Sequence, residues 1–592
     1  MKNHETKGRG GKKRWSLPIS AVALTAVLGA CNTEMGSDEP TPPTNSDNGE
    51  GEEEVADVQL VEDTQVEASN PAASPALATN RGETVVVGLQ EPGGVFTPYF
   101  NTSGYDGNVQ AVMFPPLIDI NENGEPFGRL AETWDVSDDE LTFSFTLRDD
   151  LLFDDGTPLT TEDVAFTITL LYDPSYPGTT DISETNLVGG LDYKEGDATE
   201  IAGITIVDEQ TIEFEVEEPN ARALTMLGGQ VLSKAYYGEQ YEKGDLDYIS
   251  DFHLRPLGAG PFKFEAYNPG EEIRFTSNEH YYNGEPDADA FIYRTTEGDS
   301  QQFFQTGELD YSAFAANQDN FDMLQSLEFA NIDLYTSSNY SYIAFNHESE
   351  IFEDANVRKA FNYGFDRQTY VDIRFQGFAQ VANVPVAPVS WAYTDEVEGF
   401  PFDPEEAERL LEEAGWIEGS DGIREKDGEK LRVYFFTTEA SGASDVLVTL
   451  LQEDYQRIGI DLQIEQMDFN ALLARVDNGD HDLVSFSTTM QPDPHIGVQT
   501  FHSAHTGNTF KAYGNDEIDA LIDATVAVSN LDERAAAYHE LYEALEDDPP
   551  MILLNYNKTL SATNARVEGF EPNGFRGISL SLENLNVIDV AE

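Results

Sequence analysis

Three histidines in the C-terminal third have the side chain and the spacing to bind a metal. His502 and His505 follow His495 by seven and ten residues, which would place all three on one face of a continuous helix. Neutral imidazoles bind transition metals and metal chelates. The set lacks an i, i+4 pair, so ordinary surface or cleft histidines are the favoured interpretation. We therefore predict no metal and keep these three residues as the candidate ligands.

Motifs for covalent catalysis are missing from the sequence. It contains no Gly-x-Ser-x-Gly and no His-Glu-x-x-His, and Cys31 is its single cysteine, which excludes the common nucleophile and zinc-hydrolase patterns. Acidic residues are so numerous that a pair of catalytic carboxylates is neither supported nor excluded. We predict a protein that is not an enzyme and has no cofactor, with a membrane-anchored hydrolase as an alternative.

Cys31 ends a segment that resembles a lipoprotein signal peptide. Residues 1–14 are basic, residues 15–28 are mostly apolar, and small residues precede the cysteine, which is the order of an export signal. The apolar part is shorter than the roughly 20 residues that span a bilayer. The pattern predicts that residues 1–30 are removed and that Cys31 is lipidated. The chain would then be exported and held on the extracellular or periplasmic face of the cell membrane; the alternative is an uncut anchor.

The charge of the chain is strongly one-sided. It has 110 acidic and 33 basic residues and a formal net charge of −77, a field that disfavours nucleic acid and anionic lipid as partners. Hydrophobic residues at 40% and aromatic residues at 11% are ample for a folded core. Because 1 M salt shortens electrostatic screening to roughly 3 Å, the composition favours a halophilic or alkaline source. Acidic drift without adaptive meaning is the alternative.

The elements that would position a site begin after an acidic segment. Residues 31–82 are rich in Pro, Ser, Asp and Glu and are predicted to form a disordered acidic linker. From residue 83, strand-like runs such as 141–147 and 431–436 alternate with helical patterns. Asp403–Ala414 has Pro in its first turn, a row of apolar residues on one face and Gly415 after its end, as helices do. The mixture predicts a multi-lobed α/β protein.

Several segments resemble, in order, the extracellular solute-binding proteins of ABC importers, family 5, which bind oligopeptides, dipeptides or nickel chelates. In the segment 153–166, a turn is followed by a helix that Thr160 and Asp163 are expected to cap as a capping box. In the segment 255–264, Gly258 and Gly260 are expected to form a tight turn. The matching segments are residues 85–92, 129–139, 153–166, 255–264 and 352–367.

The resemblance implies a two-lobed, periplasmic-binding-protein-like fold of the large α/β class, with an extra domain and hinged lobes around a central ligand cleft. Two crossover strands, near residues 338–346 and 553–557, would join the lobes. The implied boundaries are 83–115, 250–335 and 555–592 for lobe I, 116–249 for the extra domain, and 336–554 for lobe II.

The resemblance also implies where a ligand binds. In peptide-binding relatives, an Asp three positions before an Asp-Pro pair binds the peptide's amino group. Met490 occupies that position here, so an ammonium group would lack this charged partner. Thr488, Thr489 and Gln491 still offer hydrogen bonds to a neutral polar ligand. Asp493, between two prolines, is either a ligand contact or a residue that shapes the loop.

Five further residues are candidates for the cleft wall by the same resemblance. Aromatic side chains suit extended ligands, but they could equally pack the lobes together, and the sequence leaves both interpretations open. The five are Phe96, Thr97, Tyr99, Trp391 and Tyr393.

Together these features predict a lipid-anchored substrate-binding protein of an ABC importer. It would capture a peptide or a related polar solute by lobe closure and deliver it to the permease subunits for transport across the membrane. We expect a monomer whose partners are the ligand, the permease and the membrane through the anchor. A sensory lipoprotein with the same fold is an alternative.

Overall fold

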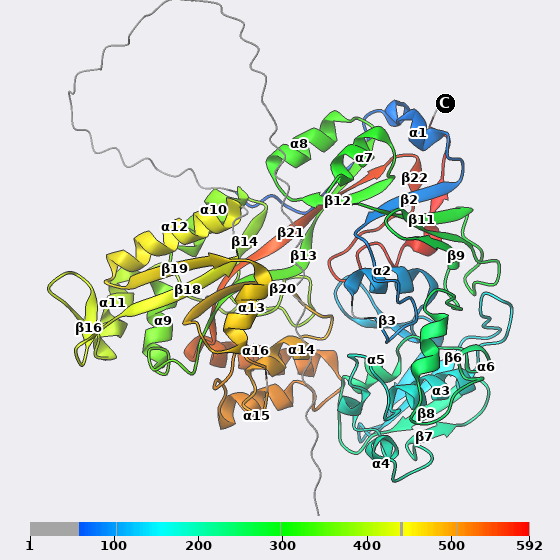
Figure 1. The fold of residues 1–592 in the computed structure, drawn as a ribbon, viewed down its shortest axis with the longest axis horizontal. Coiled ribbons are helices and arrows are strands. Elements are labelled where there is room, and N and C mark those ends of the chain that lie inside the picture. The colour runs from blue at the N-terminus through cyan, green and yellow to red at the C-terminus, as the bar shows by residue number, and fades with distance from the viewer. Residues whose placement is uncertain (1–58, 102, 297, 439–441, 506, 591–592) are drawn as a thin grey trace, which may run out of the picture. The chain divides into compact units, whose positions relative to one another are not determined.

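Two long antiparallel strands form the centre of the molecule. The computed structural model describes residues 59–101, 103–296, 298–438, 442–505 and 507–590, so Cys31 and the predicted signal peptide lie outside the described residues. The two strands are β13 (Ala330–Phe345) and β21 (Met551–Asn564), and their register shifts between Thr336 and Tyr340 and again between Ser341 and Tyr342. Such irregularities bend a strand pair. The pair runs from one half of the sheet into the other (Figure 1).

The sheet around this pair has two halves with different neighbours. On one side of β13 and β21 lie five strands that we call the N-terminal half, with β2 parallel to β11 and β12. On the other side, β20 pairs with β13 and is followed by β18 and β19, all three mutually parallel. The bounds are β12 (Tyr311–Ala315), β2 (Thr84–Leu89), β11 (Ala290–Thr295), β10 (Glu272–Ser277), β9 (Phe262–Asn268), β20 (Leu483–Thr489), β18 (Arg432–Thr438) and β19 (Asp461–Met467).

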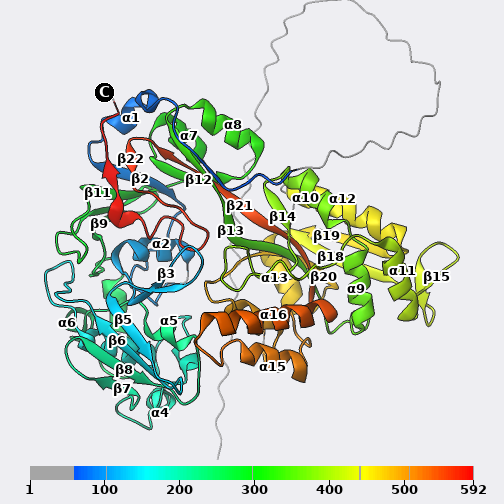
Figure 2. The ribbon, with the colours of Figure 1, turned by 180° about the vertical axis from the view of Figure 1, so that it is seen from behind.

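The C-terminal lobe is built on both faces of β18, β19 and β20. Alternate residues of a strand point to opposite faces, and Ile343 and Phe345 enter one buried cluster while Ala344 between them enters another. Figures 1 and 2 show helices on both faces. The helices are α9 (Ala355–Tyr363), α10 (Arg367–Phe375), α11 (Pro404–Glu413), α12 (Gly442–Arg457), α13 (Phe469–Asp477), α15 (Asp516–Ala524) and α16 (Leu531–Asp547).

The helix predicted over Asp403–Ala414 is confirmed as α11. Asp403 is its N-cap and accepts a hydrogen bond from the backbone N–H of Glu406, and Pro404 occupies the first turn. The apolar face is buried, and Gly415 follows with φ of +91°, a conformation that glycine adopts readily.

A second, four-stranded sheet forms what we call the N-terminal module. Its strands are antiparallel, and helix α3 (Thr161–Leu171) packs against them. The predicted capping box is confirmed. The Thr160 side chain accepts a hydrogen bond from a backbone N–H of the first turn, and the Asp163 side chain accepts one from the backbone N–H of Thr160. One continuous core joins this module to β2, β9, β10 and β11. The strands are β5 (Ala131–Val136), β6 (Thr142–Leu147), β8 (Thr211–Glu215) and β7 (Ile204–Ile206).

Gly258 and Gly260 serve close backbone packing next to helix α2 (Gly104–Met113). A β-carbon at Gly258 would lie 2.1 Å from the carbonyl oxygen of Met113, and one at Gly260 would lie 2.5 Å from that of Val112. The N–H of Gly260 donates to the Met113 carbonyl at 2.7 Å. Since neither glycine has a positive φ, the need is for space rather than for a left-handed turn, and it fixes the end of α2.

The predicted disordered linker is too long at its C-terminal end. Residues Thr64–Val66 form β1, which pairs with β13, and Ala76–Thr79 form α1. Arg81 forms an ion pair at 2.7 Å with Asp310, whose side chain is fully buried. Low hydrophobicity predicted disorder, but these residues gain hydrogen bonds and ion pairs from partners more than 200 residues away, which composition does not reveal.

The fold class is confirmed as two-lobed and mixed α/β. The strands β13 and β21, which contain both predicted crossover segments, belong to both halves of one 12-stranded sheet. Within the described ranges, every helix is too short or too polar to cross a bilayer.

Candidate ligand cavity

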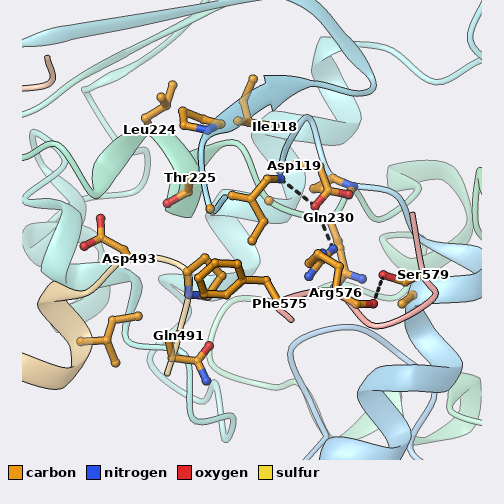
Figure 3. A pocket seen from close by; sticks show the side chains of 18 of the residues that line it. Ile118, Asp119, Leu224, Thr225, Gln230, Gln491, Asp493, Phe575, Arg576 and Ser579 are labelled. Carbon is orange, nitrogen blue, oxygen red and sulfur yellow. Dashed lines mark hydrogen bonds and ion pairs between the residues drawn. The ribbon is translucent and has the colours of Figure 1, made fainter. Parts of the chain in front are cut away.

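A cavity of about 740 Å³ lies where the C-terminal lobe faces α2, the N-terminal module and the residues after β21 (565–590), which we call the C-terminal segment (Figure 3). Its volume falls within the roughly 300–1,000 Å³ of small-molecule sites. Five separate stretches of the chain and several single residues form its wall. The wall includes residues 107–126, 221–230, 491–496, 529–534 and 575–579, together with Tyr99, Tyr293 and Trp391.

The wall beside α2 is held by polar groups that satisfy one another. Tyr99, with φ of +72°, donates its hydroxyl to the carbonyl of Gln230 at 2.8 Å. Gln110 on α2 donates its amide to the carbonyls of Val95 and Thr97 at 2.9 and 3.1 Å. These side chains therefore shape the wall, because much of their hydrogen-bonding capacity is already used.

The turn between β3 (Ile118–Ile120) and β4 (Pro126–Gly128) reaches across to the C-terminal lobe. The carbonyl of Asn123 accepts a hydrogen bond from the N–H of Trp391 at 3.0 Å. Gly124 has φ of +81°, and a β-carbon there would lie 3.3 Å from the carbonyl oxygen of Pro492. Glycine thus permits both the turn and the close contact.

A second contact closes the cavity from the N-terminal module. The N–H of Ala221 donates to the carbonyl of Val526 at 3.0 Å. The two backbone hydrogen bonds, from Ala221 and from Trp391, cross between regions that are far apart in sequence. The described residues therefore adopt an arrangement in which the C-terminal lobe touches both the module and the β3–β4 turn.

Asp493 and Arg534 form one of two ion pairs in the cavity wall. Nη2 of Arg534 lies 3.0 and 2.9 Å from the two carboxylate oxygens, and Nε donates to the carbonyl of Thr525 at 2.7 Å. Asp493 also accepts from the N–H of His495 at 3.0 Å and from the hydroxyl of Tyr538 at 3.4 Å. Burial acts to raise the pKa of the Asp493 carboxyl, but the Arg534 charge and these hydrogen bonds lower it below its usual value.

Asp119 and Arg576 form the other pair. Nη2 of Arg576 lies 2.9 Å from Oδ1 of Asp119, which also accepts from the N–H of Ile120 at 2.9 Å. The Arg576 side chain is 31% exposed and the Asp119 side chain 6% exposed. Figure 3 shows Arg576 next to Phe575, pointing toward Asp119 on β3.

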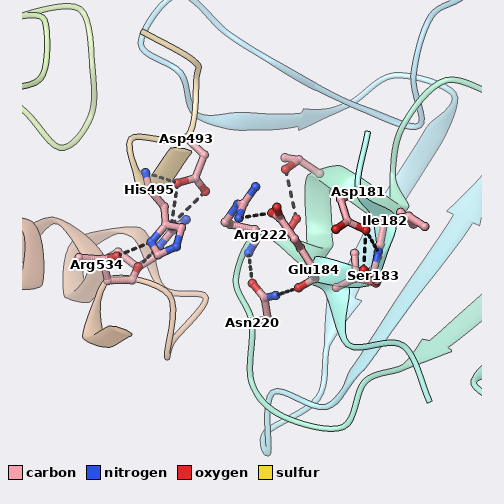
Figure 4. A network of polar contacts seen from close by, with 12 residues as sticks. Asp181, Ile182, Ser183, Glu184, Asn220, Arg222, Asp493, His495 and Arg534 are labelled. Atoms are coloured by element: carbon pink, nitrogen blue, oxygen red, sulfur yellow. Dashed lines mark hydrogen bonds and ion pairs between the residues drawn. The ribbon is translucent and has the colours of Figure 1, made fainter. Parts of the chain in front are cut away.

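His495 lies near charged groups of both the C-terminal lobe and the N-terminal module (Figure 4). Its Nδ1 lies 3.0 Å from the hydroxyl of Thr525. Burial, together with the positive charges of Arg222 and Arg534, lowers the His495 pKa to about 4 against the opposing effect of Asp493. Arg222 comes from the module, where it pairs with Glu184 at 2.6 Å. His495 is therefore neutral at ordinary pH.

The structure places four of the ten predicted ligand-contacting residues in the cavity wall: Tyr99, Trp391, Gln491 and Asp493. They come from three distant parts of the chain, and the fold brings them together. Whether they contact a ligand stays a prediction.

The other six predicted residues lie behind or beside the wall. Phe96 is fully buried against Tyr267, and Thr97 is buried 3.0 Å from a ring nitrogen of His253. Thr488 and Thr489 pair with β13, and Tyr393 packs its ring on Tyr556. Met490 is 7% exposed, belongs to a core cluster of the C-terminal lobe, and donates its N–H to the carbonyl of Ser338 at 2.9 Å.

The expectation that three histidines share one helical face is wrong. Helix α14 covers only His495–Val498, a 3₁₀ turn follows over Gln499–Phe501, and His502 is extended. The 3₁₀ turn ends at Phe501, which is 2% exposed. Within the part of the chain that the structure describes, no group of three or more His, Cys, Asp or Glu side chains is arranged to hold a metal.

Sequence reasoning missed Asp119, Arg534, Phe575 and Arg576. Asp119 lies in a three-residue strand and Arg534 in a helix rich in charged residues, so neither stands out locally. The sequence Asn573-Gly-Phe-Arg-Gly577 did offer a signal, since Asn and Gly at this density indicate a turn. The reciprocal backbone hydrogen bonds between Asn573 and Gly577 confirm such a turn.

The sheet of two lobes and the cavity between its parts define a two-lobed binding protein of the periplasmic-binding-protein class. Residues 125–509 match the family described as bacterial extracellular solute-binding proteins, family 5, in its middle part. The chain belongs to this family, which confirms the resemblance found in the sequence.

Individual relatives agree with the family and the fold. The oligopeptide-binding protein AppA of Bacillus subtilis is 25% identical over 501 residues, covering 83% of this chain and 89% of that protein. The dipeptide-binding protein of Pseudomonas aeruginosa is 26% identical over 506 residues, covering 81% and 91%. The crystal structure of the ABC transporter substrate-binding protein CtaP of Listeria monocytogenes matches with a TM-score of 0.73 at 23% identity, covering 86% of this chain and 99% of that one.

Proposed function

We propose that this protein is the substrate-binding component of an ABC importer, that it captures small peptides, and that it hands them to a permease. The observation that carries the proposal is the cavity of about 740 Å³ whose walls come from the C-terminal lobe, the module and the C-terminal segment. Binding would be reversible, with no bond made or broken. The names of the matching relatives, oligopeptide- and dipeptide-binding proteins, support the choice of peptides.

Lobe closure would couple ligand binding to recognition by the permease. The boundaries would be residues 83–115, 250–335 and 555–592 for lobe I, 116–249 for the extra domain and 336–554 for lobe II. Hinge closure needs a few residues that absorb backbone rotation. The register shifts between Thr336 and Tyr342 in β13 are our candidates. The hydrogen bonds of Ala221 and Trp391 would form on closing.

The ligand's amino group would be bound differently from the pattern known in peptide-binding relatives. Met490, which occupies the position of their ammonium-binding carboxylate, is packed in a core cluster. Asp493, three residues later, is already neutralised by Arg534 at 2.9 Å. We therefore propose that peptide backbone amides contact Gln491 and that apolar side chains pack on Trp391, both of which line the cavity.

A ligand screen at high salt tests this function. The full-length chain is heated with peptides of two to nine residues, with oligosaccharides, and with nickel chelates. A ligand that binds only the folded state stabilises it by about 2.7 kcal/mol at a hundredfold excess over Kd. We expect peptides to raise the Tm and the other two classes to leave it unchanged. No shift with any peptide, together with turnover of an ester or peptide substrate, would show that the chain is a hydrolase.

The lipid anchor is a separate part of the proposal. It places the protein as a monomer on the outer face of the cell membrane, attached through Cys31, near the permease. Mass spectrometry of the mature N-terminus tests it: we expect a chain that begins at Cys31 and carries acyl groups. A chain with an unmodified Cys31 would contradict the anchor and leave the binding function standing.

A further inference from the structure

Arg576 has more hydrogen-bonding capacity than the described residues use. A guanidinium carries five N–H donors in a planar fork. Among the described residues, the charged partner of this guanidinium is Asp119, at 2.9 Å from Nη2. Its Nε is buried and has no hydrogen-bond partner there. The donors that a ligand can reach are therefore those on the partly exposed edge of the guanidinium, which lines the cavity.

The loop that carries Arg576 is fixed in place. Asn573 and Gly577 exchange backbone hydrogen bonds at 3.0 and 3.1 Å, and the Asn573 side chain accepts from the N–H groups of Phe575 and Arg576. Ser579 donates its hydroxyl to the Arg576 carbonyl at 2.9 Å. A rigid loop holds a recognition group at a defined place, which reduces the entropy lost when a ligand binds.

Asp119 holds the Arg576 guanidinium in place without occupying all of its N–H donors. Its Oδ1 is shared between Arg576 and the N–H of Ile120. Arg129 lies close enough to act electrostatically on Asp119 as well, and Arg129 forms its own pair with Glu583 at 2.9 Å. Asp119 thus faces two guanidinium groups, and together with Glu583 the four charges balance locally.

We propose that Arg576 is the anchor for a carboxylate of the ligand, and that Asp119 positions it. This inference rests on the proposed function and names the chemical class of ligand: a zwitterionic peptide with a free C-terminal carboxylate. The guanidinium fork matches a carboxylate with two parallel hydrogen bonds. The partly exposed edge of Arg576 lines the cavity, so the ligand reaches it without breaking the pair with Asp119.

The other charged groups of the cavity favour this assignment. Arg534 is 5% exposed, with its guanidinium occupied by Asp493 and by the Thr525 carbonyl, so it has little left to offer an anion. The two ion pairs leave the wall neutral overall. A zwitterion adds no net charge to that wall, whereas a ligand with an unbalanced negative charge also meets the negative field of the protein.

The test compares peptides that differ in one group. Peptides that bind in the screen are made as free acids and as C-terminal amides, and their Kd values are measured by titration calorimetry with the full-length chain. We expect the acid to bind at least tenfold more tightly than the amide. In Arg576→Gln this preference should disappear, and in Arg576→Lys it should return in part. Arg274→Gln is the matched control, since Arg274 lies in β10 among exposed glutamates and should leave the preference unchanged.

The outcomes separate this inference from the proposed function. Equal binding of acid and amide to the unsubstituted protein would overturn the anchor while peptide binding stands, and this comparison needs no variant to fold. A tenfold preference that persists in Arg576→Gln would assign the anchor to another residue. Binding of no peptide at all would overturn the proposed function, and the anchor with it.

Discussion

The two ion pairs of the cavity wall have the same contact distance and different surroundings. In each, a guanidinium nitrogen lies 2.9 Å from a carboxylate oxygen. Arg534 also contacts the second carboxylate oxygen of Asp493. Together the two residues make further contacts with Thr525, His495, Tyr538 and Trp391. Arg576 is 31% exposed, and its Nε has no hydrogen-bond partner among the described residues. The difference separates a pair that holds the fold from one that is available to a ligand.

The comparison shows what a distance alone does not reveal. A buried pair stabilises the protein only when further hydrogen bonds satisfy its remaining donors and lone pairs. The first pair meets that condition and joins helix α16 to the loop before α14. In the second, Nε of Arg576 is buried without a partner, and the partly exposed edge of its guanidinium is the part that a ligand can reach. Substituting Arg534 should therefore cost more stability than substituting Arg576.

Arg534→Gln should have the largest effect on stability. It leaves Asp493 buried without its charged partner, which costs about 3–5 kcal/mol. Urea unfolding measures the loss. Adding Asp493→Asn should recover part of it, because the uncompensated charge is then gone and the two substitutions are coupled. A loss below about 1 kcal/mol in Arg534→Gln would show that this pair is no more structural than a surface pair.

His495→Gln should remove a step from the pH dependence of stability. The folded pKa of about 4 lies below the usual 6.5, so the unfolded chain takes up the proton first. The free energy of unfolding is therefore highest, as far as His495 is concerned, above pH 6.5. It falls as the pH drops to about 4, and His495 causes no further change below that. The size is on the order of 2–3 kcal/mol. The Gln variant should lose less stability over this window than the unsubstituted protein, and His347, whose pKa burial lowers to about 3, still titrates there.

Protonation of Asp493 in the first pair should cause a second loss of stability, at lower pH. Because the Asp493 pKa is lowered below its ordinary value of 3.8, the stability it contributes is present above pH 3.8 and is lost as the pH falls through its folded pKa. In His495→Gln this lower step should remain. If the variant loses as much stability between pH 6.5 and 4 as the unsubstituted protein does, the assignment to His495 is wrong.

Much of the fold follows from local sequence signals. Asp403, Pro404 and Gly415 fix the ends of α11, and Thr160 with Asp163 caps α3, because capping depends on residues within one turn. The same local reasoning failed for His502 and His505. Their spacing fits a helix, but the α-helix ends after Val498 and the backbone of His502 is extended, which spacing alone does not reveal.

The cavity could be predicted only in part because its residues meet through tertiary structure. Tyr99, Trp391, Gln491 and Asp493 were predicted from the family resemblance, and all four line the cavity. Asp119 and Arg576 are separated by more than 450 residues, and neither has a neighbour in sequence that suggests a partner. An ion pair of this kind becomes visible only when β3 and the C-terminal segment are placed side by side.

Arg576→Gln should cost less stability than Arg534→Gln, about 1–2 kcal/mol. Its side chain is partly solvated, and a glutamine amide still donates to Asp119, whose Oδ1 keeps the Ile120 N–H. Urea unfolding of the two variants under the same conditions gives the comparison directly. Equal losses would mean that the second pair is structural too, which would remove the reason for assigning it to a ligand.

Gly124→Ala should cost about as much stability as Arg576→Gln and should have a separate effect on binding. The β3–β4 turn has φ of +81° at Gly124, and an alanine in the left-handed region costs roughly 1–2 kcal/mol. Gly428 is the matched control, with φ of +90° and open space within 4 Å of the place that a β-carbon would take. The two alanine variants should therefore lose similar stability.

Only Gly124→Ala should weaken peptide binding, because only there does the new methyl meet Pro492 and Phe575 at 3.3 and 3.2 Å. Those contacts join the β3–β4 turn to the C-terminal lobe and to the loop that carries Arg576. We expect a several-fold rise in Kd that calorimetry detects, with Gly428→Ala unchanged. If both variants bind peptides as the unsubstituted protein does, the turn is not part of the closed cavity, and the Arg576 loop is held by Asn573 and Gly577 alone.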